Sequence, residues 1–355
     1  MIKILHICTD SNIGGAIVTL YRILMAADKT NFEHVVLIPE SSMLYDDFVA
    51  LGVHVIPIKT THDRSFSICA TFECMWHIRD HSPHIVHTHG AIFGRLAAYL
   101  SGVRSRVYTR HTYNSKQHSA LLRIINRTIT TNAVAVSPAV VDQIVSCGIR
   151  EDQISVIENG CSEYNSSVIV KDREYNLLYL GRFEREKGLL LALEGIMQLH
   201  SIDSRYSLTL VGEGKLKEEI EFYVNDNNMS DYVKVFPCQK DVASFLAENG
   251  IAINCSYKNE ATSNFIIESM SASLACVLSN AGGNKFVIND GIDGRLFDSG
   301  NLDSFVNAVL DVTDKYAYYS SRSKEKYLCR FTDKVMIDKY HALWKEEYDR
   351  FYSKE

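Results

Sequence analysis

Two glutamates separated by seven residues flank the expected start of a helix in the second half of the chain. From Glu260 to Glu268 the sequence reads EATSNFIIE, and helical periodicity begins at Asn264. With Thr262 or Ser263 as the N-cap, one carboxylate precedes the helix and the other lies about one turn into it. Because N–H groups at a helix start attract anions, this pattern suits a ligand with hydroxyls and phosphate. An ordinary charged helix start stays open as the other interpretation.

Two cations five residues apart follow an expected strand, Asn176–Leu180. The run from Gly181 to Gly188 reads GRFEREKG. In it, Arg182 supplies a planar guanidinium and Lys187 a point charge, which together could hold a diphosphate. A solvated charged turn is the alternative interpretation.

Glycine turns follow two more expected strands. Gly14 and Gly15 open the first expected helix, where they would let a ligand approach the backbone and its N–H groups. Gly212 ends the strand Ser207–Val211 in a similar way. A simple tight turn is the alternative in both places. No Gly-x-Gly-x-x-Gly follows the first strand, which argues against a dinucleotide cofactor.

Three histidines, His87, His89 and His111, close two expected strands, 84–89 and 106–111. We expect His87 and His89 to point to opposite faces of their strand, and a metal site would need a third ligand that the sequence does not supply. No Asp-x-Asp occurs in the chain, so nothing suggests a metal clamp for a diphosphate. We predict chemistry without a metal or another cofactor.

The composition is that of a globular protein of about two domains. The 355 residues are 46% hydrophobic and 23% charged, and the net charge of −6 gives no reason to expect nucleic acid as a partner. No apolar run approaches a membrane span, and the N-terminus reads as a strand without a signal peptide, so we expect a cytoplasmic protein. Nine scattered cysteines predict no disulfide framework.

Short β-branched runs alternate with helical stretches throughout the chain, which is typical of parallel sheets covered by helices. The polar stretch 159–167 interrupts this alternation and predicts a domain boundary. We expect one α/β domain over 1–165, a second over 166–332, and a final amphipathic helix, Asp333–Tyr352, within the segment 333–355 assigned to the first domain. Ligands of such sheets bind beyond the carboxyl ends of the strands, so a cleft between the domains is the expected site.

In their order along nearly the whole chain, these motifs resemble the family 4 glycosyltransferases with the GT-B fold. Segments 84–89, 135–137 and 156–160 add to the likeness. The resemblance implies two doubly wound Rossmann-like domains facing across a cleft, with the C-terminal helix crossing back to the N-terminal domain. It also implies retaining transfer of a sugar from a nucleotide diphosphate sugar, UDP favoured over GDP, to a glycan or lipid-linked acceptor in bacterial surface polysaccharide or glycolipid synthesis.

The resemblance also implies roles for individual residues, with the leaving phosphate rather than an enzyme carboxylate acting as base. Arg182 and Lys187 would hold the diphosphate, Glu268 the ribose, and Glu260 the transferred sugar. Gly15 would admit the donor, and His111 would line the reacting sugar. The catalytic candidates are therefore Glu260, His111, Arg182 and Lys187. The donor-binding candidates are Gly15, Gly181, Arg182, Lys187, Gly212, Glu260, Ser263, Asn264, Phe265 and Glu268.

Two positions depart from the family pattern. Ala261 stands where glycine is frequent, and Ser273-Leu274-Ala275 replaces a common Gly-Leu-Pro turn. Three other functions therefore stay open: a nucleotide-sugar epimerase on the same fold, a catalytically silent partner subunit, and a two-domain binding protein of the periplasmic type. The absence of a signal peptide and the charged motifs argue against the last.

The segment from His81 to Val141 contains no acidic residue and seven basic ones. Its stretch 119–127 is amphipathic, with Leu121 and Ile124 among the apolar residues and Arg123 and Arg127 as the cations. The resemblance implies docking of the basic segment 104–127 on an anionic membrane surface, which would make the protein peripheral on the inner face of the membrane. A core-packing helix with a solvated basic face is the alternative.

Overall fold

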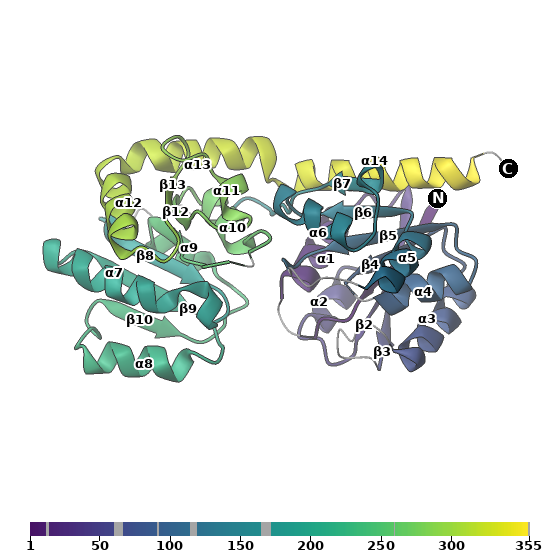
Figure 1. Ribbon diagram of the computed structural model, residues 1–355, viewed down its shortest axis with the longest axis horizontal. Coiled ribbons are helices and arrows are strands. Elements are labelled where there is room, and N and C mark those ends of the chain that lie inside the picture. Colours follow the sequence, from purple (N-terminus) through teal and green to yellow (C-terminus); the bar gives the residue numbers. More distant parts are fainter. Residues whose placement is uncertain are drawn as a thin grey trace. The chain divides into compact units, whose positions relative to one another are not determined.

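The computed structural model describes residues 1–11, 14–59, 67–90, 92–113, 119–164, 172–258 and 260–353. The chain divides into two compact units (Figure 1). Unit 1 is Met1–Gly160 with Asp333–Glu355, and unit 2 is Cys161–Thr332. The structure divides the chain after Gly160, five residues before the predicted boundary at residue 165. Residues 165–171 lie outside the described ranges.

Unit 1 is a seven-stranded parallel sheet with the strand order β3-β2-β1-β4-β5-β6-β7. The order reverses between β1 and β4, because the chain first adds strands on one side of β1 and then on the other. Its strands are β1 (Ile2–Cys8), β2 (Phe32–Pro39), β3 (His54–Ile58), β4 (Ile85–His89), β5 (Ser105–Arg110), β6 (Asn132–Ala135) and β7 (Ile154–Val156). Its helices are α1 (Gly15–Ala26), α2 (Tyr45–Ala50), α3 (Ile68–His81), α4 (Ile92–Leu100), α5 (Ala120–Ile129), α6 (Val141–Ser146) and α14 (Asp333–Tyr352).

Helix α14 forms as predicted and completes the core of unit 1, where it packs on α1, β4 and β5 (Figure 1). The middle of its apolar stripe, from Met336 to Trp344, is buried, and Trp344 is 0% exposed. The buried carboxylate of Glu347 accepts hydrogen bonds from the hydroxyls of Ser105 and Thr131, both at 2.7 Å. The last helix of the chain is therefore an integral part of the first unit.

Unit 2 is a six-stranded parallel sheet with the order β10-β9-β8-β11-β12-β13, which reverses between β8 and β11. Its strands are β8 (Asn176–Leu180), β9 (Ser207–Val211), β10 (Val233–Phe236), β11 (Ile251–Asn254), β12 (Ala275–Ser279) and β13 (Arg295–Phe297). Its helices are α7 (Leu189–Ile202), α8 (Lys217–Asp226), α9 (Ala243–Glu248), α10 (Asn264–Ser271), α11 (Asn284–Val287), α12 (Leu302–Asp314) and α13 (Tyr316–Arg330). Both units are thus Rossmann-like α/β domains, as predicted.

Helix α10 ends in a Schellman motif. The Leu274 N–H donates to the carbonyl of Ser269 and the Ser273 N–H to that of Met270, at 2.9 and 3.1 Å. Ser273 has φ = +63°, the left-handed conformation that glycine usually occupies at this position. The sequence Ser273-Leu274-Ala275 therefore still ends the helix in a Schellman motif, but with backbone strain at Ser273.

Helix α5 exposes two of its apolar side chains. Leu121 is 69% exposed and Ile124 64%, whereas Asn126 and Ile129 are the buried residues of this helix. The alternative of a core-packing helix is therefore wrong for Leu121 and Ile124, whereas Leu122 and Ile125 are half-buried, as that alternative expects. Helical periodicity shows that an apolar face exists but not which way it points. No helix in the described ranges is both long enough and apolar enough to cross a membrane.

The basic segment 104–127 does not form one charged surface. The buried Arg110 guanidinium donates to the carbonyl of Thr112 and to Oε1 of Gln143, at 3.1 and 3.2 Å. Arg106 is half-buried and donates to backbone carbonyls, including that of Ile129 at 2.9 Å. Internal acceptors satisfy both cations, so a count of charges along the sequence overstates the surface charge. Arg104, Arg123 and Arg127 are exposed, and Lys116 lies outside the described residues.

Candidate active site

The two strands at the reversal of unit 2 each deliver a charged side chain to one place. Lys187 follows β8 and Glu260 follows β11, and the Lys187 Nζ lies 2.7 Å from Oε2 of Glu260. The two side chains are only 14% and 11% exposed. Ligands of doubly wound sheets bind at the carboxyl ends of strands where the order reverses, so this pair marks the expected place in unit 2.

Two polar residues at the end of β11 hold the Glu260 carboxylate. Asn254 Nδ2 donates to Oε2 at 3.4 Å and Ser256 Oγ donates to the same oxygen at 3.2 Å. Together with Lys187, these contacts all fall on Oε2 within the described residues, which leaves Oε1 to accept a hydroxyl of a ligand. Sequence reasoning missed Asn254 and Ser256, although polar residues directly after a buried strand are a usable signal.

Glycines fix the loops around this pair. The Gly283 N–H donates to the carbonyl of Glu260 at 2.7 Å, and a Cβ on Gly283 would lie 1.8 Å from the carbonyl oxygen of Ala261. The predicted site residues Gly181 and Gly212 lie against each other, because a Cβ on Gly212 would be 1.9 Å from the carbonyl oxygen of Gly181. These glycines allow backbone segments from neighbouring strands to touch.

The structure does not bring Arg182 and Lys187 together. The Arg182 side chain is 70% exposed and its guanidinium lies 3.8 Å from the carboxylate of Glu186. Each of the two cations thus has its own carboxylate partner. The two cations therefore do not converge on one point in this structure, contrary to the expectation from their spacing.

The start of α10 lies where the sequence places it, but its cap differs. Ser263 is the N-cap residue, and its side chain makes no capping hydrogen bond. The Ile267 N–H donates to the carbonyl of Ser263 at 3.4 Å, so Asn264 and Phe265 occupy the first turn. Glu268 is half-buried about one turn into the helix, as expected.

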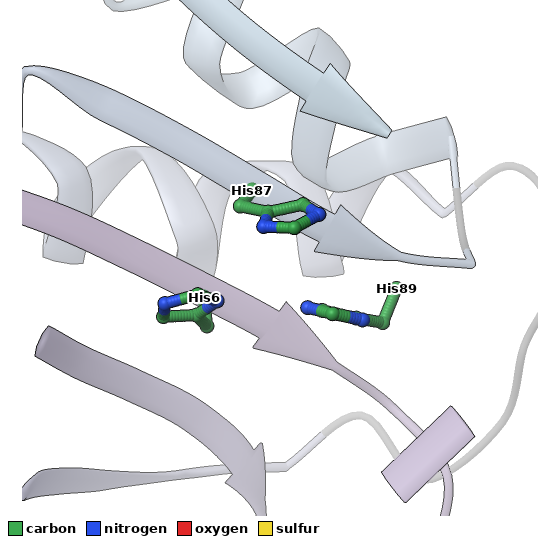
Figure 2. A group of neighbouring side chains, drawn as sticks. All are labelled: His6, His87 and His89. Atoms are coloured by element: carbon green, nitrogen blue, oxygen red, sulfur yellow. The ribbon is translucent and has the colours of Figure 1, made fainter. Parts of the chain in front are cut away.

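Three histidines in unit 1 form a buried cluster that the sequence analysis did not foresee. One ring nitrogen from each of His6, His87 and His89 lies within 4.8 Å of the others (Figure 2). The expectation that His87 and His89 point to opposite faces is wrong, because residues two apart on a strand share a face. His6 on β1 pairs in register with His87 on β4, so it is the third candidate ligand that the sequence analysis could not find.

The remaining nitrogens of these rings bind neighbours. The pairs are His6 Nε2 with His34 Nδ1 at 3.0 Å, His87 Nε2 with Thr109 Oγ1 at 2.7 Å, and His89 Nδ1 with His111 Nε2 at 3.0 Å. Burial lowers the pKa of His87 and of His111 to about 3 and that of His34 to about 4. It also holds the pKa of His6 and His89 well below the usual range, aided by neighbouring histidines. All five imidazoles are therefore neutral at pH 7.

Two predicted site residues, Gly15 and His111, belong to unit 1. Gly15 is the first residue of α1 and follows Gly14, the N-cap, whereas Asn12 and Ile13 of the same motif lie outside the described residues. His111 directly follows β5 and is hydrogen-bonded to His89. The other predicted site residues all belong to unit 2.

Two family models match this sequence. The model described as Glycosyltransferase Family 4 matches residues 13–163, and the one described as Glycosyl transferases group 1 matches residues 174–315.

Curated relatives and solved structures agree with these models. The chain is 25% identical over 289 residues to the Escherichia coli UDP-Gal:alpha-D-GlcNAc-diphosphoundecaprenol alpha-1,3-galactosyltransferase, covering 73% of this chain and 74% of the relative. It is 26% identical over 198 residues to the lipopolysaccharide 1,6-galactosyltransferase of Salmonella typhimurium, covering 52% and 54%. Its fold matches Anabaena HepE in complex with UDP and glucose with a TM-score of 0.81 at 17% identity, over 97% of this chain and 100% of that one.

Proposed function

Because the chain belongs to the family 4 glycosyltransferases with the GT-B fold, we propose that it moves a sugar from a UDP-sugar to a hydroxyl of a glycan or lipid-linked acceptor in bacterial surface polysaccharide or glycolipid synthesis. The observation that carries this proposal is the buried Lys187–Glu260 pair at the carboxyl ends of β8 and β11. We also propose that the transfer retains the anomeric configuration and needs no metal ion.

The pair is suited to a donor with both negative charge and hydroxyls. Lys187 can turn from Glu260 to a diphosphate, and Arg182, being exposed, can do the same from Glu186. Both cations would then offset the charge that develops on the leaving phosphate. Glu260 keeps Oε1 for a hydroxyl of the transferred sugar, while the start of α10 donates N–H groups to the donor.

The remaining candidate residues complete this proposal. Glu268 would accept hydrogen bonds from the ribose hydroxyls, Gly15 would admit the donor close to the backbone, and His111 would line the reacting sugar. The acceptor hydroxyl would attack from the face of the leaving group, with a phosphate oxygen of that group taking its proton. No protein carboxylate is then needed as a nucleophile.

Two similar proteins support UDP as the nucleotide of the proposed donor. The E. coli relative is named for UDP-galactose and a diphosphoundecaprenol acceptor, and HepE holds UDP with glucose in its structure. We propose the same class of donor and a glycan or lipid-linked acceptor for this chain.

We propose that α5 docks unit 1 on the inner, anionic face of the membrane, so that the protein works from the cytoplasm. Leu121 and Ile124 would enter the interface, with Arg123 and Arg127 beside the headgroups at roughly 1 kcal/mol each. The protein should co-sediment with vesicles rich in anionic lipid at low salt, and L121E/I124E should abolish this. Equal sedimentation of the double variant and the wild type would exclude α5 as the docking element.

The decisive experiment is thermal stabilisation by a panel of nucleotides and nucleotide sugars, followed by product analysis. UDP and one UDP-sugar should raise the melting temperature by mass action, equally with and without chelator. Loss of the UDP-induced shift in chelator would contradict metal-free binding. No shift with any nucleotide would leave the fold standing and favour a silent subunit.

Turnover of the donor without an acceptor distinguishes the remaining alternative. A transferase should release UDP at an acceptor-dependent rate and give a product with the donor's anomeric configuration. Donor isomerisation in the absence of acceptor would instead identify an epimerase.

A further inference from the structure

We propose that His6, His87 and His89 of unit 1 bind one divalent transition-metal ion, with Zn²⁺ as the first candidate. All three ligands belong to unit 1, apart from the donor-binding residues of unit 2, and His89 contacts His111, the residue proposed to line the reacting sugar, at 3.0 Å. The ion would hold these rings in place without touching the donor. It therefore does not alter the proposal that sugar transfer itself needs no metal ion.

The geometry of the three rings supports a common ligand. The three side chains are 0%, 0% and 3% exposed, and one ring nitrogen of each lies within 4.8 Å of the others. Figure 2 shows a ring nitrogen of His89 pointing toward the space between His6 and His87. In a tetrahedral zinc site the ligand nitrogens lie about 3.3 Å apart, so small side-chain rotations would close the site.

Within the part of the chain that the structure describes, two buried nitrogens of these three rings have no hydrogen-bond partner. They are Nδ1 of His6 and Nε2 of His89. A buried polar atom without a partner costs roughly 1–3 kcal/mol, so two such atoms in one cluster call for a ligand. Neutral imidazole nitrogens are ligands that Zn²⁺, Cu²⁺ and Ni²⁺ accept, whereas Mg²⁺ and Ca²⁺ prefer oxygen.

The opposite nitrogens of the rings are already oriented as metal-binding histidines require. His6 contacts His34, His87 contacts Thr109, and His89 contacts His111, each through one ring nitrogen at 2.7–3.0 Å. With the outer nitrogens of His6, His87 and His89 as the donors, these contacts would hold each ligand in the metal-binding tautomer and orientation. For His87 this leaves Nδ1, which lies 3.4 Å from the indole Nε1 of Trp344. The ion would replace that long hydrogen bond, and the indole N–H of Trp344 would lose this acceptor in exchange for the metal bond of His87.

Cobalt substitution in the full-length protein tests the site. Metal is removed with a chelator, the chelator is dialysed away, and Co²⁺ is titrated in while visible absorption is recorded. We expect one equivalent of Co²⁺ to bind and to show the d–d absorption bands of a tetrahedral site with nitrogen ligands. Zn²⁺ should displace the bound Co²⁺. Three shifted imidazole N–H signals in the proton NMR spectrum of the Co²⁺ form would count the three ligands.

Matched variants locate the ion. H6Q and H89Q should each weaken Co²⁺ and Zn²⁺ binding by more than about 100-fold, whereas H54Q, at an exposed histidine of β3, should bind like the wild type. Wild-type affinity in H89Q, a thiolate charge-transfer band, or no stoichiometric binding would each overturn the proposal. If a glutamine variant fails to fold, the count of imidazole N–H signals in the wild type decides, and fewer than three refutes the site.

Discussion

The two carboxylate oxygens of Glu260 have different roles, since Oε2 binds protein side chains and Oε1 is proposed to accept a hydroxyl of the ligand. Lys187, Asn254 and Ser256 all bond to Oε2, so the side chain is held in one orientation before any ligand arrives. A preorganised acceptor costs little reorganisation when the transition state forms. The proposed catalytic contribution of Glu260 therefore depends on both its charge and its fixed position.

We expect E260Q to lower kcat for sugar transfer by at least about 100-fold while the affinity for UDP changes less than about threefold. The amide keeps the shape of the side chain but removes the charge that opposes Lys187. E268A should do the reverse, weakening UDP binding with a smaller effect on kcat. Steady-state kinetics and calorimetric titration with UDP measure the two effects. Wild-type transfer rates in both variants would refute this assignment of the site.

At the scale of the element, the end of α10 is strained at Ser273. Its left-handed backbone costs roughly 1–2 kcal/mol for a residue with a Cβ, and glycine there would lose about 0.5–1 kcal/mol through its freer unfolded chain. We expect S273G to raise the free energy of unfolding by about 0.5 kcal/mol. A272G, one residue earlier at φ = −91°, should lower it, because there is no strain to relieve. Chemical denaturation compares the two variants, and equal effects would contradict the argument.

The loop after β12 positions Glu260 through backbone contact alone. We expect G283A to destabilise unit 2 and to lower the transfer rate, because its Cβ would lie 1.8 Å from the carbonyl oxygen of Ala261 and push the Glu260 loop away. G291A is the control, since its φ of +73° adds strain but its Cβ meets nothing within 4 Å. It should cost about 1 kcal/mol of stability and leave the transfer rate unchanged. Transfer at the wild-type rate in G283A would show that this loop does not position Glu260.

At the scale of the whole molecule, unit 1 depends on the last helix of the chain. A fragment comprising residues 1–160 would expose the core that Tyr340, Leu343 and Trp344 cover and would lose the Glu347 hydrogen bonds. We expect this fragment to lack a cooperative unfolding transition, whereas residues 161–332 should fold alone. A synthetic peptide of residues 333–355 should restore the transition of the first fragment. Near-UV circular dichroism follows this, and cooperative unfolding of residues 1–160 alone would contradict it.

Periodicity and motif order sufficed to predict two parallel sheets, the bounds of α14 and the position of α10, but not the short edge strand β13. Each of these features is local, since a buried strand or an amphipathic helix is readable from a window of ten to twenty residues. The segment with Lys187 was found from its charges after an expected strand, and Glu260 from its place before an expected helix start.

The features that the sequence analysis missed depend on contacts between distant segments. His6 meets His87 only because β1 lies beside β4, and the alternation of strands and helices does not give the strand order. Arg110 is buried because Gln143 and a carbonyl satisfy it, which a count of charges does not reveal. The outward face of α5 likewise depends on what the rest of unit 1 leaves uncovered.

The two ends of unit 2 lie side by side. The Cys161 N–H donates to the carbonyl of Phe331 at 3.1 Å, and the Tyr327 hydroxyl donates to the carbonyl of Cys161 at 2.9 Å. During synthesis, unit 2 is therefore complete before unit 1, although unit 1 begins first. Helix α14, which unit 1 still lacks at that point, is synthesised within about 1–4 s at a translation rate of roughly 5–20 residues per second. A ribosome that stops in this interval releases a chain with a finished unit 2 and an open unit 1, so only full-length translation yields both halves.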